Sequence, residues 1–124
     1  MYKRPVYLNL FILRLPLMGW VSIFHRVTGV LLFLALPICL YVLQYSLSGP
    51  SGFEQVNSML SHPMGRISVL IVTVSLAHHV FAGLRHLAMD MHWGVDGKVA
   101  NLSARLVLAA TGLVTIMAAW RLFQ

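Results

Sequence analysis

The chain has 124 residues, of which 59% are hydrophobic and only 10% are charged. Soluble domains usually carry charges on about a quarter of their residues, so this composition excludes an ordinary soluble domain and indicates a membrane protein. Nine Lys and Arg residues against three Asp and Glu residues give a net charge of +6. Because these cations lie mostly at the ends of apolar runs, they favour contact with lipid headgroups over a nucleic-acid-binding face.

The N-terminal segment combines basic residues with a short apolar run, as a signal peptide does. Arg14 and Pro16 interrupt this run, however, and no small-residue cleavage site follows it. We therefore expect residues 1–19 to remain in the mature chain as a cytoplasmic segment.

Three apolar segments are long enough to cross a bilayer, since about 20 helical residues span about 30 Å of hydrocarbon. The sequence predicts one membrane-anchor domain, 1–124, with transmembrane helices at about 20–47, 66–89 and 103–123. The predicted fold class is therefore an all-α membrane protein.

Polar stretches separate the predicted helices. Residues 46–65 are rich in Gly, Ser and Pro, which predicts a loop that holds one short interfacial helix. Residues 90–103 form a shorter polar turn, in which Asn101 or Ser103 is suited to cap the start of the last helix.

The positive charges predict how the chain is oriented in the membrane. With three spans, the N-terminus and the second loop lie on one side, together with seven cations: Lys3, Arg4, Arg14, Arg26, Arg85, Lys98 and Arg105. Only Arg66 and Arg121 lie near the other side. Under the positive-inside rule, this bias predicts an N-terminus in the cytoplasm, or on the matrix side in a mitochondrion.

An unusual group of ionisable residues lies in the second predicted helix, where Ser75–Asp90 contains three histidines and an arginine. At about 100° per residue, His79, Gly83 and His86 lie along one stripe, whereas His78 points about 100° away from His79. One helix therefore cannot aim both neighbouring histidines at one centre. A glycine one turn after His79 would also let a flat group approach the helix beside the imidazole.

The first predicted helix carries a matching set of residues at the same depth. Ser22 and Arg26 are one turn apart, and so are His25 and Gly29. Ionisable residues cost free energy inside a membrane, so they usually face a partner, a cavity or a cofactor. Simpler explanations remain open, because arginines can extend to headgroups and serines, histidines and glycines can serve helix packing.

Four stretches, in this order and at these separations, resemble a known family: "RPVYLNL", "SIFHRVTGV", "GPSGFEQVNSM" and "HHVFAGLRHLAMD". Together they closely resemble the cytochrome b membrane-anchor subunit of succinate dehydrogenase, respiratory complex II. The "GFEQ" loop is similar to that of proteobacterial members. The resemblance covers nearly the whole chain, from Arg4 to the end of the third helix.

The resemblance implies roles for individual residues. The histidine four residues before the glycine of "HVFAGLRH", His79, would be an axial ligand of haem b. Ser22 and Arg26 would bind ubiquinone, and Asp90 would help to relay protons unless it is only a solvated carboxylate at a helix end. The haem pocket, including the groups near the propionates, would consist of His25, Arg26, Gly29, Gly83, Arg85 and His86.

The resemblance also implies partners and a location. A second three-helix anchor would pack with this chain into one haem-binding bundle and supply the other axial ligand. An iron-sulfur subunit and a flavoprotein subunit would carry the clusters and the FAD, so this chain would have no catalytic residue of its own. The complex would lie in the bacterial inner membrane, in contact with lipid and ubiquinone and with no nucleic acid.

Two alternatives to a succinate:ubiquinone oxidoreductase remain at this point. A fumarate reductase anchor, which serves menaquinol oxidation, would share the same residues. A non-redox membrane scaffold would have the same composition, with histidines that only pair its helices.

Overall fold

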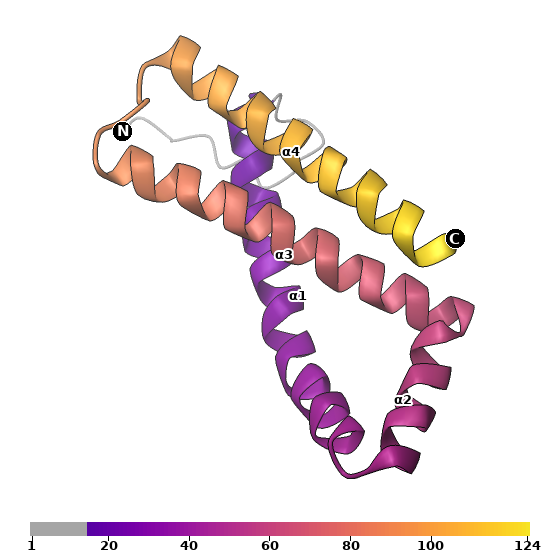
Figure 1. The fold of residues 1–124 in the computed structure, drawn as a ribbon. Helices are drawn as coiled ribbons and strands as arrows, with labels where there is room; N and C mark the ends of the chain where they lie inside the picture. Colours follow the sequence, from indigo (N-terminus) through magenta and orange to yellow (C-terminus); the bar gives the residue numbers. More distant parts are fainter. Residues whose placement is uncertain (1–14) are drawn as a thin grey trace, which may run out of the picture.

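The computed structural model describes residues 15–124, which form four helices (Figure 1). These are α1 (Leu17–Ser46), α2 (Pro50–Ser61), α3 (Pro63–Asp90) and α4 (Gly97–Phe123). The three longer helices are long and apolar enough to cross a membrane. The prediction of an all-α membrane protein with three long helices and one short one is confirmed. The cations at positions 3, 4 and 14, which contribute to the predicted orientation, lie outside the described residues.

Proline and glycine explain where the helices around α2 begin. Gly49 has a φ of 145°, which favours glycine, and Pro50 follows it as the first residue of α2. Pro63 is the first residue of α3, and it disfavours helical backbone at the residue before it. His62 accordingly has an extended backbone, with φ −65° and ψ 147°, so α2 ends there and α3 starts in a new direction.

The start of α4 differs from the prediction, since neither Asn101 nor Ser103 caps it. The helix begins at Gly97, after Asp96, so both predicted caps lie inside it. Gly94, with a φ of 74°, already turns the chain before that point. The Ser103 hydroxyl instead donates a hydrogen bond to the Ala100 carbonyl at 3.0 Å, as a serine inside a helix commonly does.

The helices α3 and α4 lie side by side, and α1 crosses them at a steep angle (Figure 1). Four small or medium apolar residues form the buried core where the three helices meet: Val21, Ala82, Ala104 and Val107. Small residues let membrane helices approach closely, which strengthens their van der Waals contact. This crossing brings the first half of α1 against the second half of α3.

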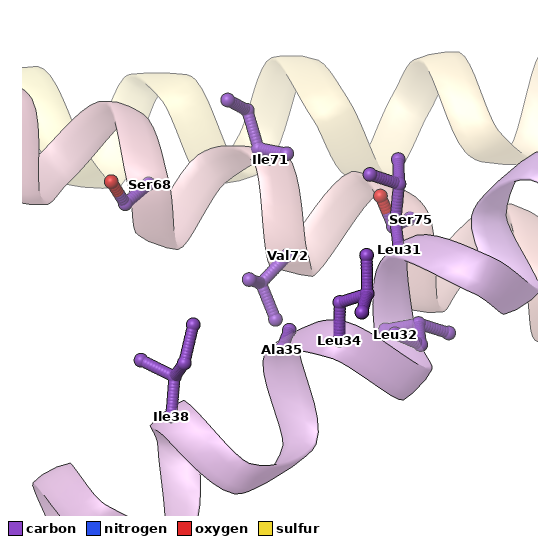
Figure 2. Close-up of a pocket in the computed structure, with 9 residues that line it drawn as sticks. All are labelled: Leu31, Leu32, Leu34, Ala35, Ile38, Ser68, Ile71, Val72 and Ser75. Carbon is purple, nitrogen blue, oxygen red and sulfur yellow. The ribbon is translucent and has the colours of Figure 1, made fainter.

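Beyond the crossing, α1 and α3 diverge, and α2 joins their far ends (Figure 1). A cavity of about 1000 Å³ lies between the three helices there, and a smaller one of about 260 Å³ lies closer to the crossing. Ser68 and Ser75 are the only polar residues among the nine that line the smaller cavity (Figure 2). The smaller cavity is therefore lined almost wholly by apolar side chains, and none of the histidines of α1 and α3 is among them.

Candidate functional site

Two histidine-glycine pairs face each other where α1 crosses α3. The rings of His25 and His79 stack with their centroids 4.2 Å apart and an angle of 12° between their planes. A Cβ atom added to Gly29 would lie 3.0 Å from Cε1 of His79, and one added to Gly83 would lie 3.3 Å from Nε2 of His25. Each glycine therefore makes room for the imidazole of the opposite helix.

A backbone carbonyl orients the imidazole of His79. Its Nδ1 atom lies 3.2 Å from the carbonyl oxygen of His25. A carbonyl oxygen can only accept a hydrogen bond, so this contact places the ring proton on Nδ1. The Nε2 atom of neutral His79 then keeps its lone pair, which is the arrangement that metal-binding histidines usually have.

His86 completes this group of residues. Its ring centroid lies 5.1 Å from that of His25, at an interplanar angle of 59°. The residues His25, Gly29, His79, Gly83 and His86 are called the histidine-glycine cluster below. The stripe that the sequence predicts on α3 thus faces α1, and its rings are half-buried.

The neighbouring His78 points away from this cluster. Its side chain is only 5% exposed, and its Nδ1 atom lies 3.4 Å from the Thr111 hydroxyl of α4. Phe24 of α1 meets the ring edge-on, with centroids 6.1 Å apart. The Nε2 atom is buried, and within residues 15–124 no atom meets it in good hydrogen-bond geometry. His78 is therefore enclosed by the three long helices of its own chain, so an external group cannot reach it without displacing them.

Arg85 also faces α4 rather than the histidine-glycine cluster. It is 8% exposed, and its Nε atom donates to the Ser103 hydroxyl at 3.0 Å. Its Nη2 atom donates to the Ala100 carbonyl at 3.1 Å. The sequence reasoning missed Thr111, Ser103 and the Ala100 carbonyl as partners of the polar residues of α3. The sequence shows that Ser103 and Thr111 put hydroxyls in an apolar helix, but it does not show which residues they contact. It gives no indication of the Ala100 carbonyl.

The three residues predicted to bind quinone or relay protons lie around the cluster. Ser22 is half-buried one turn before Arg26, which is exposed and adjacent in sequence to His25. Asp90 is exposed at the last position of α3, one turn after His86. Their positions put a hydroxyl, a guanidinium and a carboxylate at the same end of the α1–α3 pair.

Residues 1–118 match the profile of the family described as the succinate dehydrogenase/fumarate reductase transmembrane subunit. The chain belongs to this family. As a member of the succinate dehydrogenase/fumarate reductase family, it is a multi-pass membrane subunit of the succinate dehydrogenase complex.

Individual relatives within this family cover nearly the full chain. The succinate dehydrogenase cytochrome b556 subunit of Coxiella burnetii is 32% identical over 94% of this chain and 94% of its own length. The cytochrome b560 subunit of Reclinomonas americana is 30% identical, covering 98% of this chain and 87% of its own. The cytochrome b556 subunit of Paracoccus denitrificans is 27% identical, covering 93% and 88%. The similarity therefore includes all three long helices.

Proposed function

We propose that this chain is the membrane anchor of a succinate:ubiquinone oxidoreductase in which His79 is one of two axial ligands of haem b. The observation that carries the proposal is the contact between Nδ1 of His79 and the His25 carbonyl, which leaves Nε2 free on a half-buried ring. The names of the relatives, cytochrome b556 and b560 subunits of succinate dehydrogenase, support a haem.

The two adjacent histidines have different environments, which favours a single ligand from this chain. A haem of the electron-transfer type would be held by two strong ligands, of which one helix can supply only one. His78 is enclosed against Thr111 and Phe24, whereas His79 lies on the side of α3 that faces α1. The second axial ligand then comes from a partner chain, which we take to be a second three-helix anchor that completes the haem-binding bundle.

The remaining residues of the histidine-glycine cluster line the pocket in this proposal. Gly29 and Gly83 keep space for the rings, and His25 and His86 present imidazole nitrogens near the end of the helix pair. The guanidinium of Arg26, which is exposed, can donate hydrogen bonds to an anionic propionate. Two nitrogens of Arg85 already donate to α4, so we assign Arg85 a contribution through its positive charge.

Ser22, Arg26 and Asp90 form part of the ubiquinone-reduction site in this proposal. A hydroxyl and a guanidinium one turn apart can both donate to a quinone carbonyl, and the cation stabilises the negative charge that develops as electrons arrive. Asp90 is exposed at the end of α3, where its carboxylate can exchange protons with water. The haem, when bound, supplies reversible one-electron transfer.

The proposal also includes the partners and the orientation. FAD and the iron-sulfur clusters belong to a flavoprotein subunit and an iron-sulfur subunit, where succinate is oxidised. We place the chain in a bacterial inner membrane, with spans at about 20–47, 66–89 and 103–123 and with residues 1–19 in the cytoplasm. The complex then delivers electrons to ubiquinone on the cytoplasmic side.

The test is a reduced-minus-oxidised spectrum of the purified complex. We expect a haem b signal that His79→Ala abolishes and that His78→Ala largely spares, at most with a lower haem content. Loss of the signal in His78→Ala together with its retention in His79→Ala would show that the ligand is the other histidine. Turnover with ubiquinone and with menaquinol then decides the direction, since an anchor of the fumarate reductase type would favour menaquinol.

A further inference from the structure

Two polar residues on the buried face of α3 contact α4. Its four buried residues are Ser75, His78, Ala82 and Arg85. The His78 ring contacts the Thr111 hydroxyl, and the Arg85 guanidinium contacts the Ser103 hydroxyl and the Ala100 carbonyl. His78 and Arg85 are seven residues apart, which is about two helical turns, so both contacts lie along one line of α3. Because His78 and Arg85 are both held by α4, they resist rotation of α3 about its own axis.

The hydrogen-bond chemistry gives His78 a defined role in this contact. The Thr111 hydroxyl donates its hydrogen to the Val107 carbonyl at 2.8 Å. The same oxygen, 3.4 Å from Nδ1 of His78, is therefore the acceptor, and the imidazole is the donor. Phe24 of α1 meets the ring edge-on from the other side. His78 thus contacts both neighbouring helices.

The position of His79 depends on the same rotation. His78 and His79 are consecutive residues, so their side chains leave the helix about 100° apart. A roll of α3 that moves His78 away from Thr111 also moves His79 away from the His25 carbonyl and from the space beside Gly29.

We propose that His78 is a positioning residue, which holds α3 against Thr111 of α4 at the rotation that presents His79 to its ligand site. The proposal rests on the proposed function, since it takes His79 as the haem ligand. The two consecutive histidines then have different roles. The imidazole of His79 binds the haem iron, and the imidazole of His78 orients the helix that carries His79.

The decisive variant is Thr111→Val, which keeps the shape of the side chain and removes the acceptor for His78. Its matched control is Thr115→Val, because the Thr115 hydroxyl donates only to the Thr111 carbonyl one turn earlier in the same helix, at 2.8 Å. On α3, His78→Phe keeps a ring without a donor, whereas His78→Asn keeps an N–H group close to the position of Nδ1.

The readouts are the electron paramagnetic resonance g values of the oxidised haem, its midpoint potential and the haem content of the assembled complex. Partners that orient a metal ligand typically contribute 10- to 100-fold in affinity, so we expect Thr111→Val and His78→Phe to weaken haem binding by about tenfold and to shift the g values. His78→Asn and Thr115→Val should match the unsubstituted complex in all three measurements.

Two outcomes would overturn this proposal or the proposed function, and Thr111→Val covers the case in which His78→Phe does not assemble. If Thr111→Val and Thr115→Val give the same g values, potential and haem content, His78 does not position His79, even when His79→Ala abolishes the haem signal. If His79→Ala retains the signal, the proposed function itself fails. If His78→Phe does not assemble, as judged by succinate oxidation with an artificial dye acceptor, Thr111→Val alone gives the answer.

Discussion

The Nδ1 atom of His79 lies 3.2 Å from the backbone carbonyl oxygen of His25, on a different helix. This contact links the tautomer of the proposed ligand to the packing of α1 on α3, because a carbonyl accepts only from a protonated Nδ1. The imidazole of His25 takes no part in this contact; it stacks on the His79 ring beside Gly83. Any change in the distance between α1 and α3 therefore shifts the imidazole of His79.

Gly29→Ala should disturb the ligand more than Gly83→Ala does. The added Cβ would lie 3.0 Å from Cε1 of His79 and 3.4 Å from its Nδ1, whereas at Gly83 it would lie 3.3 Å from one atom of His25. Because a group that orients a metal ligand is typically worth 10- to 100-fold in affinity, we expect Gly29→Ala to reduce haem affinity by about tenfold or more. Haem content per assembled complex measures this effect.

Gly112→Ala in α4 is the matched control for both substitutions, since no atom of residues 15–124 outside its own turn lies within 4 Å of a Cβ added there. It should leave the haem content unchanged. Equal haem content in the Gly29 and Gly112 variants would contradict the view that the glycine keeps space for the ligand.

Arg85→Met should destabilise the packing of α3 on α4. The substitution keeps most of the aliphatic stem and removes the donors to Ser103 and to the Ala100 carbonyl, within a contact where Arg85 is 8% exposed. Hydrogen bonds from charged groups contribute about 1.5–3 kcal/mol in water-soluble proteins, and interhelical ones in membranes average about 0.6 kcal/mol. We expect a loss of about 1–3 kcal/mol.

The temperature at which the purified complex loses its haem band reports this loss. The control is Arg105→Met, which removes an exposed arginine from α4. If both variants lose the band at the same temperature, the buried contacts of Arg85 contribute nothing to stability beyond its charge.

Helical periodicity predicts part of the site, and the packing of the helices decides the rest. The positions of His79, Gly83 and His86 on one face follow from 100° per residue alone, as does the divergence of His78. The helix that each face meets does not follow, because it depends on the close approach of Ala82 and Ala104 in the core.

The error at the start of α4 has a related cause. Asn101 and Ser103 are typical capping residues, but the turn at Gly94 starts the helix earlier. Ser103 then serves as the acceptor for Arg85 of another helix. A polar residue near a helix end has several possible partners. It can cap a backbone N–H group of its own helix or contact a side chain of another helix, and the sequence alone does not distinguish the two.

Labelling should locate the two loops on opposite sides of the membrane. In a Cys39→Ser background, Ser51→Cys places a thiol on α2 and Val95→Cys places one in the turn before α4, and both positions are exposed. The positive-inside rule predicts that a membrane-impermeant maleimide labels only the Ser51 variant in intact spheroplasts. Labelling of the Val95 variant in its place would reverse the orientation.

Ser22→Ala and Arg26→Leu should slow quinone reduction without affecting succinate oxidation. Removing a charged or hydroxyl donor to a quinone carbonyl costs about 1.5–3 kcal/mol when the acceptor becomes charged, which corresponds to about 10- to 100-fold in rate. Succinate oxidation with an artificial dye acceptor depends on the flavoprotein and iron-sulfur subunits, so it should stay near the level of the unsubstituted complex.

Ser46→Ala is a suitable control for these two variants because it removes a hydroxyl from the far end of the same helix. The Ser46 hydroxyl donates to the Leu43 carbonyl at 2.8 Å, so its loss removes a bond within α1. It should retain both activities. If the Ser22 and Arg26 variants lose dye reduction as much as quinone reduction, their defect is in assembly, and the two residues do not form the quinone site. A selective loss of quinone reduction in both, with Ser46→Ala unaffected, is the pattern that direct contact with the quinone requires.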